Sequence, residues 1–172
     1  IHSYITDRNG KKIAQTKEQA FTLPAQGVHK LKQHVTLTNP RLWSVDDPYC
    51  YKVVSVITSG NKDIHTQKNR LGIRTIHFDA ANGFFLNGQP LKIKGTNNHQ
   101  DHAGVGSALP DYLQYYRIRL LKNMGSNAYR TSHHAPTTEL LDACDSLGML
   151  VVDEQRLLNS SPEYLAQFER LI

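Results

Sequence analysis

The stretch GSNAYRTSHHAPTTELLDACDSLGMLVVDE, residues 125–154, decides the fold of the second half of the chain. A short predicted strand at 127–130 precedes a segment at 138–147 in which apolar residues recur at helical spacing. Thr137 or Thr138 can cap that helix, and Gly148 can end it. The run 149–152 is apolar at every position, which is typical of a parallel strand covered on both faces. A strand, a helix and a second parallel strand therefore follow one another.

The same alternation extends on both sides of this stretch. Upstream, residues 84–86 and the turn 87–90 predict a hairpin that leads into a strand at 91–94. Pro110 and Asp111 then open a helix that Gly125 closes. Downstream, Ser161 and Pro162 occupy the N-cap and first position of a third helix. Three strand–helix units with right-handed crossovers are too few to close an eight-stranded barrel, so we expect part of a TIM (β/α)8 barrel.

The first half of the chain has the pattern of β structure. Residues 28–38 and 51–58 alternate or are rich in β-branched residues, and turn residues lie at 39–40, 46–48 and 59–61. About five short strands predict an immunoglobulin-like sandwich that lacks some of its usual seven. We therefore expect an incomplete sandwich over residues 1–78, followed by the first three barrel units over residues 79–172.

Composition excludes several classes of function. With 39% hydrophobic and 20% charged residues, the 172-residue chain is typical of a globular protein. It has no run of about 18 apolar residues, so we expect no membrane span. Residues 1–78 hold twelve Lys and Arg against five Asp and Glu. The lysines are spaced singly, which favours a solvated sheet face over a nucleic-acid surface. Cys50 and Cys144 are expected to be buried thiols without a disulfide.

Polar residues follow each predicted parallel strand, at 95–102, 130–134 and 153–156. Because the carboxyl ends of parallel strands meet at one edge, we expect these side chains to converge. Amide, imidazole, guanidinium and carboxylate groups together suit a ligand covered in hydroxyls. The sequence therefore predicts a site for such a ligand at this edge. Its candidate residues are His99, His133 and Asp101 as ligand contacts and Asn97, Arg130 and Glu154 as candidate supports.

The residues at this edge also bear on other chemistries. The histidines at 99, 102, 133 and 134, with Asp101, could supply a metal site for a metal-dependent hydrolase. Asp153 and Glu154 are neighbours on a strand and should face opposite sides, so they do not form a glycosidase carboxylate pair. Adjacency of Ser132 and His133 does not make a nucleophile–base pair. Arg130 either holds a neighbouring carboxylate or contacts the ligand directly.

Several motifs in order resemble glycoside hydrolase family 2, which includes β-galactosidases, β-glucuronidases and β-mannosidases. The matching segments are RLWSVDDPYCY at 41–51, GIRTI at 72–76, FLNGQP at 85–90, KGTNNH at 94–99 and NAYRTSH at 127–133. The resemblance covers most of residues 40–172, whereas residues 1–38 resemble the family only in being strand-like. Two family motifs depart from their commoner form, at 98–102 and 132–136.

The resemblance implies a retaining glycosidase that acts on terminal β-linked sugars, and we expect these to be β-galactosides. Its acid/base and nucleophile glutamates lie on later barrel strands, so we expect none of the catalytic residues in this chain and no activity from it alone. The family places His99 and His133 on sugar hydroxyls, and Arg130 beside the nucleophile. Magnesium or sodium occurs in the family. The usual magnesium motif is replaced here by QRLL at 155–158, so we assign no metal and no cofactor.

The resemblance and the predicted fold also bear on partners. The motif HQDHAGVG at 99–106 is similar to a bacterial branch of the family, cytoplasmic or periplasmic. Three barrel units leave a parallel strand edge uncovered, so we expect a homo-oligomer, or self-association of this chain, or partial disorder over residues 155–172. The alternative function is a carbohydrate-binding or interaction module in which the sandwich alone is functional.

Overall fold

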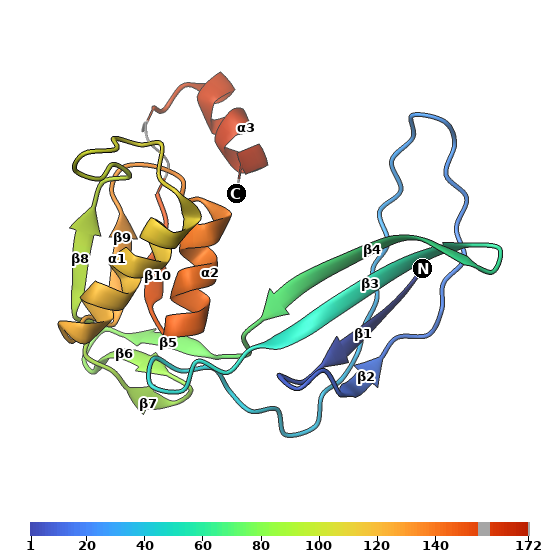
Figure 1. The fold of residues 1–172 in the computed structure, drawn as a ribbon, viewed down its shortest axis with the longest axis horizontal. Coiled ribbons are helices and arrows are strands. Elements are labelled where there is room, and N and C mark those ends of the chain that lie inside the picture. The colour runs from blue at the N-terminus through green and yellow to red at the C-terminus, as the bar shows by residue number, and fades with distance from the viewer. Residues whose placement is uncertain (155–158, 172) are drawn as a thin grey trace. The chain divides into compact units, whose positions relative to one another are not determined.

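The computed structural model describes residues 1–154 and 159–171, which fall into two compact units, Ile1–Leu91 and Lys92–Ile172. Unit 1 contains seven of the strands among these residues, and unit 2 contains the helices and a parallel sheet (Figure 1). None of the described helices is long and apolar enough to cross a membrane.

Unit 1 is built on an antiparallel sheet of four strands in the order β2-β1-β3-β4. These strands are β1 His2–Thr6, β2 Lys12–Gln15, β3 Tyr51–Ser59 and β4 Lys62–Leu71. The strand predicted at 51–58 is confirmed as β3, which turns into β4 at Gly60 with φ of 59°. Tyr51, Val54 and Val56 of β3 and Ile5 of β1 are buried. Ile5 pairs with Val53 and so shares a face with Tyr51, whereas Val54 and Val56 point to the other face, and both faces of the sheet therefore carry buried side chains.

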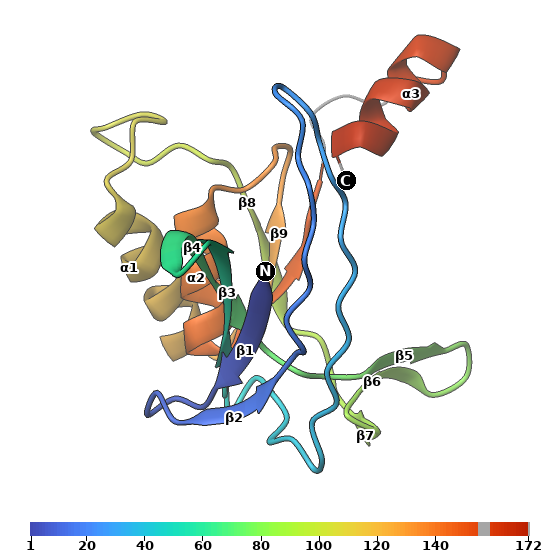
Figure 2. The same ribbon diagram turned by 90° about the vertical axis from the view of Figure 1, so that its right-hand side faces the viewer.

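The strand predicted at 28–38 is wrong. These residues lie in the second of two long extended segments between β2 and β3, which carry no strand pairing (Figure 2). A strand needs a partner for its backbone N–H and C=O groups, and alternation in sequence does not supply one. Gln33 is tied instead through its side chain, which donates to the carbonyl of Lys17 at 3.3 Å. Val28 is 86% exposed, as expected for an edge without a covering layer.

A second small sheet of unit 1 is formed by β5 Ile76–Asp79, β6 Gly83–Leu86 and β7 Gln89–Pro90. The predicted turn is confirmed, with Asn87 and Gly88 at φ of 54° and 75°, as a two-residue hairpin requires. The Asn87 side chain donates to the carbonyl of Trp43 and accepts from the Thr75 N–H. These bonds hold the hairpin to unit 1, which extends to Leu91.

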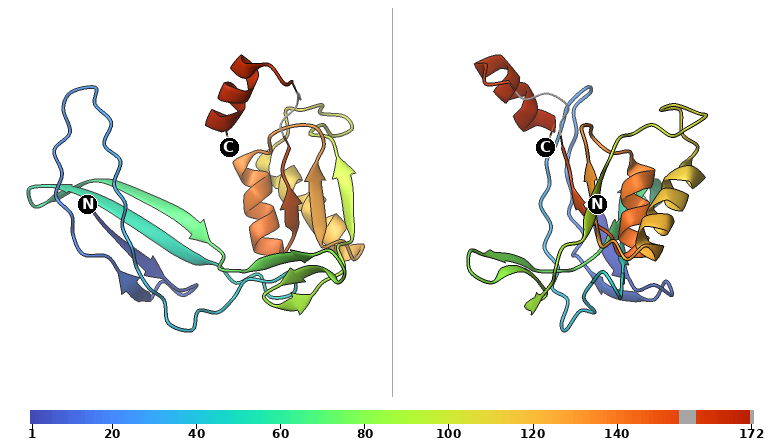
Figure 3. Two further views of the ribbon diagram at one scale, coloured as in Figure 1. Left: turned by 180° about the vertical axis from the view of Figure 1, so that it is seen from behind. Right: turned by 90° about the vertical axis from the view of Figure 1, so that its left-hand side faces the viewer.

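Unit 2 contains a parallel sheet in the order β10-β9-β8, formed by β8 Gly95–Asn98, β9 Ala128–Thr131 and β10 Leu150–Val152. Helices α1 Asp111–Asn123 and α2 Thr138–Leu147 cover one face of it (Figure 3). The core lies on that face and contains Ile118, Tyr129, Leu140, Ala143, Cys144 and Met149. Consecutive strand order with helices on one face is the arrangement of a barrel wall, whereas doubly wound sheets carry helices on both faces.

The strand predicted at 91–94 is displaced to 95–98, which places Asn97 within β8. The side chain of Asn127 accounts for the shift. Its Oδ1 accepts from the N–H of Lys94 and its Nδ2 donates to the carbonyl of Lys92, so the backbone at 92–94 is bonded to a side chain. Pairing with β9 begins at Gly95, where a Cβ atom would lie 3.0 Å from the Ala128 carbonyl oxygen.

The three predicted helix starts and two of the predicted helix stops are confirmed. Thr137 is the N-cap of α2 and its hydroxyl accepts from the Leu140 N–H at 3.3 Å. Gly148 ends α2 in the left-handed conformation. Ser161 accepts from the Tyr164 N–H at the start of α3, Pro162–Leu171. The disorder expected over residues 155–172 falls in part on residues 155–158 and 172, which lie outside the described residues.

Replacing Thr137 with Ala should destabilise the protein by about 1 kcal/mol, because the N–H of Leu140 loses its acceptor. The measurement is the midpoint of urea unfolding. Thr138→Ala is the matched control, since Thr138 is the adjacent, exposed threonine inside the helix. Equal effects of the two substitutions would contradict the cap assignment.

The two cysteines should differ in reactivity. They form no disulfide, as predicted, and burial raises the pKa of the Cys144 thiol to about 12. Because only thiolates react with disulfide reagents, Cys144 should react with an aromatic disulfide only after unfolding, whereas half-buried Cys50 should react in the folded state. The check is to titrate Cys50→Ser, in which Cys144 is the one remaining cysteine, with the aromatic disulfide in native buffer. Rapid reaction of this variant would contradict the prediction.

Candidate functional site

The carboxylate of Glu154, just beyond β10, is held by two basic side chains from β9 and the loop after it. Arg130 Nε donates to Glu154 Oε1 at 2.7 Å, and Arg130 Nη2 donates to the same oxygen. His133 Nδ1 lies 2.8 Å from Oε2. Both carboxylate oxygens are therefore occupied, and the Glu154 side chain is only 19% exposed.

The environment of Glu154 fixes its charge. Partial burial acts to raise the pKa of this carboxyl, but the hydrogen bonds and positive charge of Arg130 and His133 outweigh burial and hold the pKa below its ordinary value. Glu154 is thus an anion at neutral pH. A general acid in a glycosidase needs a raised pKa, so this arrangement suits an anchor for Arg130 and His133 better than a proton donor.

Asn97 shares a face with this cluster. The register pairs Asn97 of β8 with Arg130 of β9, and Arg130 with Val152 of β10. Their neighbours Tyr129 and Val151 pack against the helices, so Asn97 and Arg130 lie on the opposite face of the sheet. In a barrel that face lines the interior.

His99 and His133 come together at the same edge. Their rings are 6.1 Å apart between centroids and nearly perpendicular, at 82°. Both side chains are exposed, so their unbonded ring nitrogens can reach a ligand. Five predicted residues therefore gather at one edge of the sheet: Asn97, His99, Arg130, His133 and Glu154.

Asp101 is the predicted residue that the structure does not bring into this cluster. Its backbone carbonyl accepts from Arg117, and among the described residues its exposed carboxylate makes no hydrogen bond or ion pair. Asp153 and Glu154 have different partners. The Thr131 hydroxyl lies 3.4 Å from Asp153 Oδ1, and it also accepts from the N–H of Glu154.

The metal-site alternative has no supporting geometry in residues 1–154 and 159–171, where no three His, Cys, Asp or Glu side chains form a metal-binding group. His134, adjacent to His133, is buried and lines a separate cavity. The motif positions 155–158 lie outside the described residues.

The separate cavity has a volume of about 310 Å³ and lies within unit 2 under the loop that follows β8. Its polar lining includes Gln114, Arg117, Tyr129 and His134. Sequence reasoning missed Arg117. The available signal was the pair Gln114 and Arg117, two polar residues three apart on the helix stripe that continues to buried Ile118.

Burial lowers the pKa of His134 below the ordinary 6.5, and the charges of His99 and Arg117 act in the same direction, against Ser132 and Asp153. Around and below pH 6.5, His134 is therefore protonated to a greater extent in the unfolded chain than in the folded one. Stability should therefore fall as pH drops through about 6.5 and level off below the folded-state pKa. The thermal midpoint should fall as pH is lowered from about 7.5 to 5.5. This fall should be smaller in His134→Asn than in His34→Asn, which replaces an exposed histidine and serves as the control.

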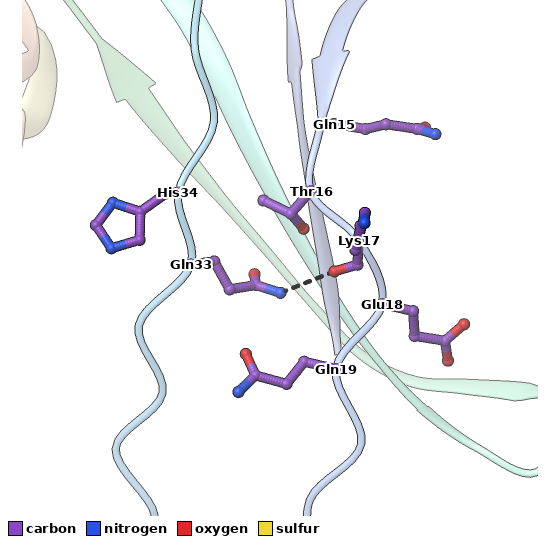
Figure 4. Close-up of a pocket in the computed structure, with 7 residues that line it drawn as sticks. All are labelled: Gln15, Thr16, Lys17, Glu18, Gln19, Gln33 and His34. Atoms are coloured by element: carbon purple, nitrogen blue, oxygen red, sulfur yellow. Dashed lines mark hydrogen bonds between the residues drawn. The ribbon is translucent and has the colours of Figure 1, made fainter.

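Unit 1 has a hollow of about 420 Å³ between its two extended segments, near the Gln33–Lys17 hydrogen bond. Figure 4 shows that Gln15 and Glu18 point away from the gap and that His34 points to the far side of its own segment. The side chains do not converge, so this hollow gives no geometric support to a binding function of the sandwich alone.

Comparisons with known proteins match both units. The model "Glycosyl hydrolases family 2, TIM barrel domain" matches residues 79–165, and "Glycosyl hydrolases family 2" matches residues 1–74. A β-galactosidase of Bacteroides ovatus is 35% identical over 90% of this chain and 18% of its own length. A putative β-glucuronidase of Formosa agariphila is 33% identical over 85% of this chain and 19% of its length.

A solved structure is similar as well. The family 2 glycosyl hydrolase of Bacteroides cellulosilyticus has a TM-score of 0.78 and 40% identity, and the match covers 90% of this chain and 21% of that one. The chain therefore spans about a fifth of the length of these relatives.

Proposed function

Because this chain belongs to glycosyl hydrolase family 2, we propose that it forms the sugar-binding first part of the active site of a retaining β-glycosidase. Residues 1–78 are the back part of the immunoglobulin-like sandwich, and residues 79–172 are the first three β/α units of the catalytic barrel. The sandwich followed by the start of the barrel is supported by the two family matches.

The observation that carries the proposal is the cluster around Glu154. Arg130 and His133 are fixed by one carboxylate, and His133 in turn faces His99 across 6.1 Å. Such a cluster offers imidazole and amide groups that donate and accept, as a hydroxyl-covered ligand requires. His99, His133 and, from the loop outside the cluster, Asp101 are the proposed contacts to the sugar, while Asn97, Arg130 and Glu154 support the cluster.

The proposed substrate is a neutral sugar such as a β-galactoside, because neither arginine described near this edge is free to bind a carboxylate. A uronic acid needs a cation for its carboxylate, and Arg130 is already paired with Glu154. Arg117 donates to two backbone carbonyls. The curated relatives include both β-galactosidases and β-glucuronidases, so the two substrates must be compared directly.

The two catalytic glutamates are proposed to come from barrel strands that follow this segment, so the chain alone should be inactive. The test compares the full-length protein that contains this segment with the 172-residue chain on chromogenic β-galactoside and β-glucuronide. We expect the full-length protein to cleave the galactoside and the chain to cleave neither. Turnover by the chain would overturn the proposal that its catalytic carboxylates lie elsewhere. Faster cleavage of the β-glucuronide than of the β-galactoside by the full-length protein would overturn the proposed substrate.

The chain expressed by itself should self-associate, because the outer edges of β8 and β10 in the three-stranded sheet have no neighbour within the described residues. Light scattering of the purified chain measures this directly. A monomer over a wide concentration range would count against it.

A further inference from the structure

The guanidinium of Arg117, on α1, lies against the loop that follows β8. Nη1 donates to the carbonyl of His99 at 2.9 Å, and Nη2 donates to the carbonyl of Asp101 at 2.5 Å. Nη1 also lies 3.4 Å from the hydroxyl of Tyr129 on β9. One side chain therefore joins the loop, the helix and the central strand of the sheet.

The geometry of these bonds requires an arginine. Residues 99–101 lie outside any strand or helix, so their carbonyls are not bonded in a ladder. A planar guanidinium presents several N–H groups in a fixed fork and can reach two carbonyls two residues apart at once. A lysine ammonium is a single point and cannot hold the same pair in one orientation.

The other end of this contact is rigid. Tyr129 is fully buried and packs with Ile118 and Cys144 in the core of unit 2. Burial raises the pKa of the Tyr129 hydroxyl, so it stays protonated and neutral beside the guanidinium. The loop backbone is therefore tied through Arg117 to the best-packed part of the unit. Beyond it, the His102–Gly106 bridge closes the loop into a turn.

We infer that Arg117 is a positioning residue for sugar binding, which holds the backbone of residues 99–101 so that the His99 ring stays beside His133. The inference rests on the proposed function, in which His99 contacts a sugar hydroxyl. Arg117 acts from behind the loop and touches neither the substrate nor the Glu154 cluster, among the contacts that the structure describes.

The test is a double-mutant cycle in the full-length protein, with Arg117→Met and His99→Ala alone and together. Arg117→Met should lower kcat/KM on a chromogenic β-galactoside by about 10- to 100-fold, mainly through KM, because a displaced loop weakens binding. The kcat/KM of Arg117→Lys should lie between those of Arg117→Met and the wild type. Arg119→Met is the matched control on the same helix, since exposed Arg119 stacks on Tyr116 and should leave kcat/KM within about twofold.

The cycle separates positioning from general stability. If Arg117 acts through His99, Arg117→Met should change kcat/KM by less than about twofold in the His99→Ala background. Full additivity of the two losses would overturn the inference. If Arg117→Met does not fold, Arg117→Lys carries the same cycle, with a smaller first effect and the same expected loss of additivity.

A second readout does not depend on activity. Hydrogen exchange of peptides that cover residues 99–102 should be at least about tenfold faster in Arg117→Met than in Arg119→Met. Unchanged exchange would overturn the inference, whatever the activity shows. If His99→Ala alone leaves kcat/KM unchanged, the proposed role of His99 fails instead. Failure of the proposed function and failure of this inference are therefore distinguishable.

Discussion

Glu154→Gln in the full-length protein should lower kcat/KM on β-galactosides by about 100-fold. The amide keeps the shape of the carboxylate but loses its charge. One of its two ends becomes an NH₂ donor, which cannot accept from Arg130 or His133. Both basic side chains then lose their anchor, and their displacement from the reacting geometry reduces the rate. Steady-state kinetics measures the loss.

The pH dependence of this variant gives an independent check. Because Arg130 and His133 hold the pKa of Glu154 below its ordinary value, the wild-type anchor should stay ionised as pH falls to that value and fail only below it. The contribution of the ion pairs to stability is thus present above the ordinary carboxyl pKa and is lost as pH falls through the lowered one. A plot of stability against pH should therefore fall in acid for the wild type, and the part of this fall that comes from Glu154 should be missing in Glu154→Gln.

Two further variants decide between an anchor and a catalytic role. Arg130→Met should cause a loss similar to that of Glu154→Gln, and the double variant should be little worse than either, because the two residues act as one unit. Glu139→Gln, an exposed glutamate in the first turn of α2, is the control. Rescue of Glu154→Gln by an added small nucleophile such as azide would show a covalent role and contradict the anchor.

The sequence predicted the parts of the fold that depend on local interactions. Thr137 and Gly148 bound α2 because a hydroxyl acceptor and a left-handed glycine satisfy helix ends within a few residues. The strand at 28–38 failed because its existence depends on a distant partner that the alternation does not specify. The start of β8 was misplaced because Asn127, more than 30 positions away, bonds the backbone at 92 and 94.

The same distinction applies to the candidate site. Polar residues beyond parallel strands converge by topology, which is why His99, Arg130, His133 and Glu154 could be grouped from sequence. The pairing of Arg130 with Glu154, left open by the sequence, required the register of β9 and β10. Arg117 was missed because its partners are backbone carbonyls, which carry no signature in the sequence; only its spacing from Gln114 on the helix marked it.

Replacing Trp43 with Ala should lower the free energy of unfolding of unit 1 by about 3–5 kcal/mol, the usual loss for truncating a large buried aromatic side chain. Trp43 is 2% exposed, and the Arg74 guanidinium lies 4.8 Å from the centre of its ring. A Cβ atom at Gly72 would lie 3.2 Å from the ring, so the segment at 72–74 packs directly against it. The backbone of Trp43 accepts from Asn87 and donates to the carbonyl of Ile73.

Because Trp43 connects residues 72–74 and the β6–β7 turn, removing its side chain should destabilise these segments as well as its own. Hydrogen exchange of peptides covering 41–45, 72–75 and β3 should become at least about a hundredfold faster, as follows from 3 kcal/mol at 1.4 kcal/mol per tenfold. Leu42→Ala, at a side chain that is 38% exposed, should change exchange less than about tenfold. Trp43→Phe should lie between them. If all three variants exchange alike, the buried ring is not what holds these segments together, and the hydrogen bonds of Asn87 and Ile73 suffice.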